Sequence, residues 1–433
     1  MKIIRNIFIG VLTLFVVLIG IIQYVSISAL DTLIEQAESE TRPLSRWHTT
    51  ASDLTVNDND LVNVIFVGNN WQGSITVIAL DGYRKIGVID GIPDKLERLK
   101  EVRSQFIERM LYIGIRELVG EGNDQFVDDM YSSNDGRKII VSRPSFADVV
   151  AIDSLTGEVV WRFPVAGFRS DHMAISPDGK YVAVSASTGD LVHIIDVETG
   201  VEHAQFPSGD SPHENIYSKD GKHLFHASIG NVFSPLDFDG GGLLKGKRVV
   251  QVVETTNYTI VEKFDMRDKL DAVGLEHISP AVRPMAHTSD EEYFYFQLSF
   301  LHGFVEYHLP TGKITRKIDL PKVTTAPKTK YVNDSAHHGI AISADDKTLC
   351  VAGTMDDYVA IVDIQSEQYQ ILDGLGKKPY WVVTDKTGSH CFVSWSETDQ
   401  VSVISYQDAA EVARIDVGDH PQRVREGVLV FPK

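Results

Sequence analysis

Three histidines stand at matching places in segments of similar pattern. His172 lies in DHMAISPDGK, His213 in PHENIYSKDG and His338 in HHGIAISADD. Each segment is a short apolar stretch followed by a turn rich in Asp and Gly. Imidazole nitrogens bind zinc, copper, iron and nickel, and three of them leave a coordination position open for substrate. We therefore expect a site for a divalent transition metal (copper, iron or zinc), provided that the fold brings the three segments around one point.

Further residues in the same pattern extend this hypothesis. His287, His337 or a carboxylate would complete the metal shell, and Glu214 is the candidate general base. Three arginines are candidates for a bidentate clamp on a carboxylate or phosphate: Arg143, Arg283 and Arg423. If the site is catalytic, the metal acts as a Lewis acid or redox centre on a small anionic substrate.

One other interpretation remains open from the residues alone. Buried histidines often satisfy backbone groups or bind ordered water, in which case the protein is a non-catalytic scaffold that binds a ligand or another protein. The sequence holds no G-x-S-x-G, P-loop, H-E-x-x-H or C-x-x-C motif. It also has no C-x-x-C-H motif for haem attachment.

The elements that would position these residues follow from a repeat. Residues 171–200 read as three short strands separated by turns, and such a unit cannot bury both of its faces alone. The turn glycines Gly136, Gly179 and Gly221 recur every 42–43 residues. A period of about 40–50 residues with four strands in each repeat is typical of β-propellers.

Aligning the repeats predicts an all-β fold, a seven-bladed β-propeller over residues 60–433. The first blade, in residues 63–89, has only three strands, and one strand is left over in residues 420–431. We expect this C-terminal strand to close blade one and so remove two unpaired sheet edges. Residues 93–120 have helical periodicity and are predicted to be an amphipathic helix packed across one face of the propeller. A role as a lid or docking helix is the alternative.

The blade pattern resembles the YVTN/YncE-like seven-bladed propellers. The resemblance rests on the IFVGNN and GSITVIAL segments in blade one and on ISPDGKYVAVS and VHIIDVETG in blade three, and it covers residues 60–431. It implies the seven-bladed fold. It does not settle function, because related propellers include binding proteins, lactonase-like enzymes and the haem-binding domain of nitrite reductases.

The N-terminus predicts export. Residues 6–22 are an uncharged apolar run that is long enough, with the residues after it, to span a bilayer, which takes about 20 residues. Lys2 and Arg5 precede the run and acidic residues follow it, so the chain after residue 30 faces the periplasm or cell exterior. We expect a single-pass anchor in the cytoplasmic membrane (residues 1–30) and an acidic stalk (residues 31–59). A cleaved signal peptide is the competing interpretation.

Composition excludes one class of partner and predicts the state of the cysteines. The formal net charge of −19 argues against a nucleic-acid partner. Cys350 and Cys391 are the two cysteines, at equivalent places in neighbouring repeats. We expect such positions to be too far apart for a disulfide, so both are predicted to be buried thiols.

Overall fold

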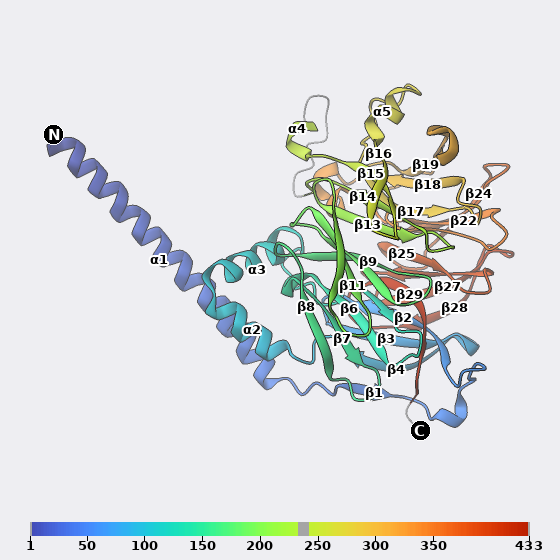
Figure 1. Ribbon diagram of the computed structural model, residues 1–433, viewed down its shortest axis with the longest axis horizontal. Helices are drawn as coiled ribbons and strands as arrows, with labels where there is room; N and C mark the ends of the chain where they lie inside the picture. The colour runs from blue at the N-terminus through green and yellow to red at the C-terminus, as the bar shows by residue number, and fades with distance from the viewer. Residues whose placement is uncertain (1, 233–241, 432–433) are drawn as a thin grey trace. The chain divides into compact units, whose positions relative to one another are not determined.

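In the computed structural model, residues 2–232 and 242–431 are described, apart from the side chains of residues 2–19, 51, 242 and 243. The strands of this part form seven antiparallel sheets, which are the blades of a propeller (Figure 1). The prediction of an all-β, seven-bladed propeller is confirmed.

Blade one is built from both ends of the propeller sequence. Its sheet runs in the order β1-β4-β3-β2-β29, with β1 at Ser45–Trp47, β2 at Val62–Asn69, β3 at Ser74–Ala79, β4 at Arg84–Asp90 and β29 at Pro421–Leu429. The C-terminal strand pairs with β2 along its length, so closure of blade one by the C-terminal segment is confirmed. The outermost strand, β1, lies within residues predicted to be a stalk.

The other six blades each have four strands joined by consecutive turns. Blades two and three comprise β5 Asp129–Ser132, β6 Lys138–Arg143, β7 Asp148–Asp153, β8 Val159–Pro164, β9 Ser170–Ile175, β10 Tyr181–Ala186, β11 Leu191–Asp196 and β12 Glu202–Pro207. Blades four and five comprise β13 Pro212–Tyr217, β14 His223–Ser228, β15 Val249–Glu254, β16 Thr259–Asp265, β17 Val282–His287, β18 Tyr293–Leu298, β19 Gly303–His308 and β20 Lys313–Asp319. Blades six and seven comprise β21 Ile340–Ile342, β22 Thr348–Gly353, β23 Tyr358–Asp363, β24 Tyr369–Asp373, β25 Pro379–Thr384, β26 His390–Trp395, β27 Gln400–Ser405 and β28 Ala410–Asp416.

The repeated turn has a local physical cause. In blade three the Asp178 carboxylate accepts hydrogen bonds from the Ser176 hydroxyl (2.7 Å) and the Lys180 amide (3.1 Å). Gly179 then adopts φ +71°, a left-handed conformation that glycine reaches without steric cost. This turn joins the innermost strand of the blade to the second strand, which is why it marks the repeat so clearly in the sequence.

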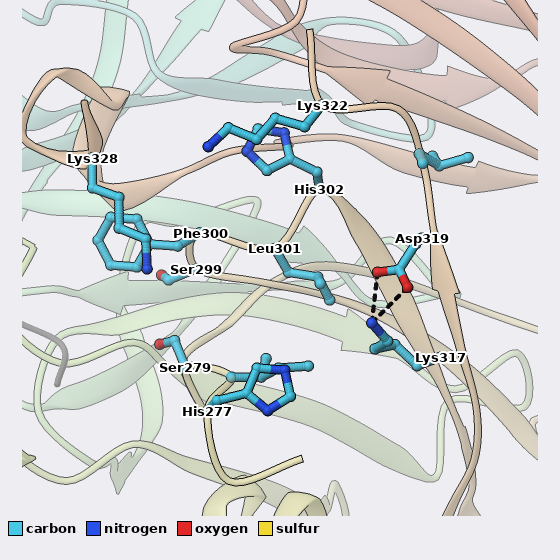
Figure 2. A pocket seen from close by; sticks show the side chains of 12 residues that line it. His277, Ser279, Ser299, Phe300, Leu301, His302, Lys317, Asp319, Lys322 and Lys328 are labelled. Atoms are coloured by element: carbon cyan, nitrogen blue, oxygen red, sulfur yellow. Dashed lines mark hydrogen bonds and ion pairs between the residues drawn. The ribbon is translucent and has the colours of Figure 1, made fainter. Parts of the chain in front are cut away.

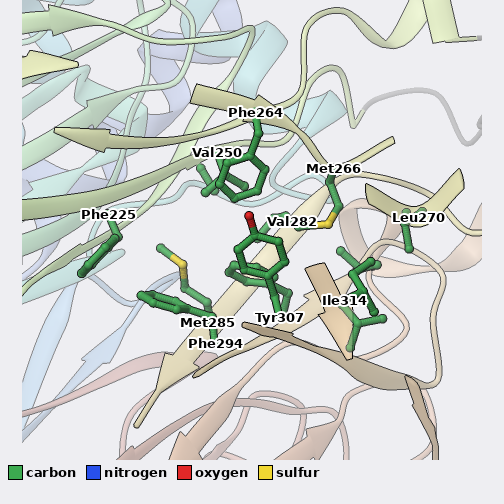
Figure 3. Packing of buried hydrophobic residues seen from close by; sticks show 14 of the residues in the cluster. Phe225, Val250, Phe264, Met266, Leu270, Val282, Met285, Phe294, Tyr307 and Ile314 are labelled. Atoms are coloured by element: carbon green, nitrogen blue, oxygen red, sulfur yellow. The ribbon is translucent and has the colours of Figure 1, made fainter. Parts of the chain in front are cut away.

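Hydrophobic packing between neighbouring blades forms the core. Between blades four and five, Phe264 and Tyr307 stack with ring centroids 5.0 Å apart, and Phe225 meets Phe294 edge to face at 4.7 Å (Figure 3). Inner strands are buried on both faces, whereas β8 alternates between half-buried and exposed side chains. The blades are therefore held face to face, and only their outer strands meet solvent on one side.

The cysteine prediction is wrong. Cys350 on β22 and Cys391 on β26 form a disulfide between blades six and seven, with Cα atoms 6.5 Å apart. Both side chains are fully buried in one apolar cluster. Blades six and seven pack tightly, so their second strands approach within disulfide range. The prediction from the sequence overestimated the distance between these two strands.

The helices near the N-terminus form a compact unit of their own, residues 1–42 with 93–123. It contains α1 (Lys2–Ser39), α2 (Lys95–Ser104) and α3 (Phe106–Leu118). Within it Arg109 of α3 donates to Gln23 (2.6 Å) and Ser26 (3.0 Å) of α1. The single helix predicted in residues 93–120 is two helices, because Gln105 between them is extended. Its packing on a propeller face stays a prediction.

The membrane anchor also stays a prediction. No helix among the described residues is long and apolar enough to cross a membrane. The predicted span, residues 6–22, falls almost wholly among residues whose side chains lie outside that description. The remaining short helices are α4 Gly242–Lys245, α5 Met266–Asp271 and 3₁₀ turns at Ala51–Asp53, Asp81–Tyr83, Pro144–Phe146, Leu309–Thr311, Lys328–Lys330 and Val332–Asp334.

Candidate functional site

The innermost strands of the seven blades surround the centre of the propeller, and three of them bring histidines together. His172 lies on β9, His213 on β13, and His338 two residues before β21. One ring nitrogen from each lies within 4.8 Å of the other two. The ring centroids of His172 and His213 are 3.7 Å apart, and that of His338 is 6.0 and 5.7 Å from them. We call these three residues the channel triad.

The hydrogen bonds of the triad leave ring nitrogens available. His172 Nδ1 lies 2.8 Å from Glu214 Oε2, and His338 Nδ1 lies 3.4 Å from the Tyr380 carbonyl oxygen. Within the described chain, His213 Nδ1 and His338 Nε2 have no hydrogen-bond partner although they are buried. A histidine whose second nitrogen is held by a carboxylate or a carbonyl is the usual arrangement of a metal ligand.

Burial fixes the protonation state of the triad. All three side chains are nearly inaccessible to solvent, with exposed fractions of 2%, 4% and 1%. Burial is the largest cause that holds the pKa of each imidazole well below its usual value. The positive charge of Arg423 lowers all three pKa values further, and that of Arg283 also lowers those of His213 and His338. The triad is therefore neutral at physiological pH, which is the form that binds metal ions.

Two arginines lie in the same buried region with donors that are not used. Arg423 on β29 packs on the Trp381 ring, with 3.8 Å from its guanidinium carbon to the ring centroid. Its Nε and Nη1 have no partner in the described part of the chain, and Asp128 Oδ2 is 4.0 Å from its Nη2. Arg283 on β17 donates from Nε to Ser299 Oγ at 3.0 Å, while its Nη2 has no partner there.

The guanidinium groups of Arg283 and Arg423 have the chemistry to bind an anion. Arg283 and Arg423 are 1% and 0% exposed, and burial lowers the pKa of Arg283. Burying a charge without a partner costs several kcal/mol per ion, and buried donors without acceptors are rare in folded proteins. An oxyanion between the two arginines would satisfy the free donors and offset the charge.

Carboxyl groups line the other side of the triad. Asp171 Oδ1 is 3.5 Å from His172 Nε2, and Asp128, Asp171 and His172 form a second potential ligand group. Asp171 is itself held by Arg169 at 2.7 Å. Burial raises the pKa of Glu214 to about 8 and that of Asp128 to about 6. Of the additional ligands expected from the sequence, the structure brings a carboxylate to the triad.

The other predicted residues lie elsewhere. Arg143 makes a bidentate pair with Asp148 (2.8 and 2.9 Å), and both side chains are fully buried. His287, at the end of β17, is half-buried with its Nδ1 2.9 Å from the Thr288 carbonyl oxygen. His337 belongs to a separate group with His302 and Asp356. Of the three arginines of the predicted anion clamp, Arg143 is thus already paired, while Arg283 and Arg423 lie in the buried region of the triad.

The sequence could have shown that His337 and His338 do not both join the triad. His337 and His338 are adjacent in an extended segment, and adjacent residues of such a segment point to opposite sides. Only one of the pair could therefore join the triad. Asp356, in the turn after β22, was not singled out at all, because a TMDD turn gives no sign of which carboxylate points inward.

Comparisons with known proteins support the fold and go no further. No protein-family model matches the chain, and no curated protein matches its sequence. Among solved structures, Kuenenia stuttgartiensis hydrazine synthase is similar over 68% of this chain and 88% of that chain, with a TM-score of 0.52 and 15% identity. Similarity at this identity supports the propeller fold alone. Membership of the YVTN/YncE-like family remains a prediction.

Proposed function

We propose that this protein is an exported, membrane-anchored propeller that holds a divalent transition metal and a small anion side by side in its central channel. His172, His213 and His338 bind the metal, and Arg283 and Arg423 bind a carboxylate or phosphate group. One observation carries the proposal: neutral imidazoles from three blades place their nitrogens within 4.8 Å of one another, beside buried guanidinium donors that have no partner among the described residues.

The chemistry that fits this arrangement is metal-dependent oxidoreductase or lyase chemistry on a small anionic substrate. The metal would supply Lewis acidity or a redox centre. Arg423, held against Trp381, and Arg283, held by Ser299, would orient the anion without reorganising. Glu214, whose pKa burial raises to about 8, is the group that would hold a proton next to His172 at neutral pH.

Charge couples the two ligands. A divalent cation beside two guanidinium groups gives a buried site with a large excess of positive charge. An anion between the metal and the arginines removes much of that excess, so each ligand should raise the affinity for the other. We therefore expect metal binding to tighten when a small oxyanion is present.

The location is proposed on two grounds. The uncharged apolar run of residues 6–22 favours a membrane anchor with the propeller outside the cytoplasm. The buried disulfide between Cys350 and Cys391 agrees with this, because disulfides persist mainly in oxidising compartments.

A non-catalytic binding propeller is the second candidate. This candidate is favoured, independently of any metal, by the donors of Arg283 and Arg423 that have no partner among the described residues. These donors would bind an anion even if the triad stays empty. In that case the protein would bind the same oxyanion with unchanged affinity after metal is removed by a chelator.

Metal analysis of the purified full-length chain distinguishes the two candidates. The wild type, purified without chelator, is compared with His213→Ala and with His287→Ala, a control histidine on an inner strand outside the triad. The metal-centre proposal predicts that only His213→Ala loses one equivalent of metal. Equal metal contents in all three proteins, after reconstitution with zinc, copper and iron, would contradict it.

A further inference from the structure

A second group of ligating side chains converges between blades five and six. His302 follows β18, His337 precedes β21, and Asp356 lies between β22 and β23. One ligating atom from each lies within 4.8 Å of the others. His302 Nδ1 is 2.5 Å and His337 Nε2 is 3.2 Å from the same carboxylate oxygen, Asp356 Oδ2. The two imidazoles thus contact the same carboxylate oxygen.

We propose that His302, His337 and Asp356 form a second site for a divalent first-row transition metal, independent of the channel triad. Two histidines and one carboxylate are a common ligand set for zinc and non-haem iron. In a tetrahedral site with bonds of about 2.0 Å, neighbouring ligand atoms lie about 3.3 Å apart. The 3.2 Å between His337 and Asp356 already matches this spacing. The contact from His302 would open by under about 1 Å.

The outer atoms of two of these ligands, His302 and Asp356, are fixed by partners of their own. His302 Nε2 lies 2.9 Å from the Tyr331 hydroxyl. Asp356 Oδ1 accepts hydrogen bonds from the backbone amides of Val323 (2.7 Å) and Thr324 (2.8 Å). Nδ1 of His302 and Oδ2 of Asp356 are thereby directed at each other. This is the support that metal ligands receive from the residues behind them.

In the part of the chain that the structure describes, His337 Nδ1 is buried and has no hydrogen-bond partner. The Tyr358 hydroxyl lies 3.3 Å from His337 Nε2 and donates to the Pro321 carbonyl oxygen at 2.8 Å.

A cavity borders the group at His302. His302 is one of the residues that line a cavity of about 320 Å³, together with Ser299 and Phe300 (Figure 2). Three lysines line it as well: Lys317, Lys322 and Lys328. Asp319 pairs with Lys317 at 2.6 and 2.7 Å, and it is the only acidic residue among those lining this cavity. The remaining positive charge favours a small anion as the exchangeable ligand of the metal.

Metal stoichiometry of the full-length chain tests the proposal. The protein is stripped with chelator and titrated with Co²⁺ and with Zn²⁺ alone, and binding is followed by calorimetry and by the Co²⁺ absorption spectrum. His302→Gln is the main variant, because it removes a ligand and leaves the anchoring bonds from Val323 and Thr324 to Asp356 intact. His308→Gln, on the adjacent strand β19 and outside the group, is the matched control.

We expect His302→Gln to weaken one Zn²⁺ equivalent by at least about 100-fold, while His308→Gln binds as the wild type does. Asp356→Asn should lose the same equivalent; if that variant does not fold, His302→Gln decides. The His172→Ala, His213→Ala, His338→Ala variant must keep this equivalent, so failure of the channel site is told apart from failure of this one. Unchanged stoichiometry and affinity in His302→Gln would overturn the second site.

Discussion

The buried arginines of the channel show how a single residue can indicate a ligand. A guanidinium that is closed off from water normally has its donors paired, as Arg143 does with Asp148. Arg283 and Arg423 depart from that rule in the described structure, and both lie beside the channel triad. A bound anion that contacts both arginines would account for the unused donors of each.

Replacing either arginine should weaken anion binding and leave metal binding in place. A charge-assisted hydrogen bond contributes about 1.5–3 kcal/mol, so Arg423→Gln or Arg283→Gln should lower the affinity for inorganic phosphate or acetate by about 10- to 100-fold. Calorimetric titration of the metal-loaded protein measures this. Arg162→Gln, a surface arginine paired with Asp148, serves as the control. Equal anion affinity in Arg423→Gln and Arg162→Gln would argue against the clamp.

Glu426 on β29 predicts a pH effect on stability that is separate from the site. Burial, the largest cause, raises its pKa to about 7 from the usual 4.5. Between these two values the folded state binds more protons than the unfolded state, so its contribution to stability is lost as pH rises from about 4.5 to about 7.

Glu426→Gln should therefore match the wild type near pH 4 and be more stable at pH 8. Solvent screening of this half-buried group limits the expected gain to about 1 kcal/mol. Urea unfolding of both proteins at several pH values measures the difference. A difference that does not change between pH 4 and pH 8 would show that Glu426 titrates normally.

Some site residues were predictable from the sequence and others were not. His172, His213 and His338 were found because a repeat places equivalent residues of different blades around one axis. The sequence did not distinguish His287 from these three histidines, because the position of a residue in a strand does not show how far along the channel its side chain lies. Arg143 looked equivalent to Arg283 in type, yet its partner Asp148 is visible only in three dimensions.

At the scale of the element, turns and strands were the most predictable feature. Alternating or continuous apolar runs bounded by Asp-Gly turns correspond to local hydrogen bonding, such as the Ser176–Asp178–Lys180 turn. The fifth strand of blade one, Ser45–Trp47, was not predicted, since three residues carry no periodicity. The inter-blade disulfide was missed because it depends on the distance between elements, which sequence spacing does not give.

The disulfide should contribute measurably to stability. It links positions 41 residues apart, and closing a loop of that size in the unfolded chain corresponds to about 3–4 kcal/mol. The double variant Cys350→Ala, Cys391→Ala should unfold at lower denaturant concentration than the oxidised wild type. Reductant should shift the wild type towards the variant and leave the variant unchanged. Coincident unfolding curves for the oxidised wild type and the variant would contradict this contribution.

Pairing of β29 with β2 closes the ring of seven blades. β29 supplies the innermost strand of blade one, and it also carries Arg423 into the channel and pairs Arg425 with Asp129 of blade two at 2.7 and 2.8 Å. The C-terminal segment therefore joins the two ends of the propeller and completes the proposed site in one step.

Truncation before residue 420 should abolish both closure and ligand binding. Without β29 the inner edge of β2 is unpaired and apolar residues such as Leu429 no longer cover the core between blades one and two. We expect loss of cooperative unfolding and rapid proteolysis. A truncated protein that unfolds with the same midpoint and slope as the full chain would rule out a closing role.

Anomalous diffraction shows whether the channel triad binds a metal. Crystals of the full-length chain, loaded with zinc or copper, are measured above and below the absorption edge of the metal. We expect an anomalous peak about 2.0–2.2 Å from one ring nitrogen each of His172, His213 and His338. Metal peaks elsewhere in the crystal with none at the triad would contradict it.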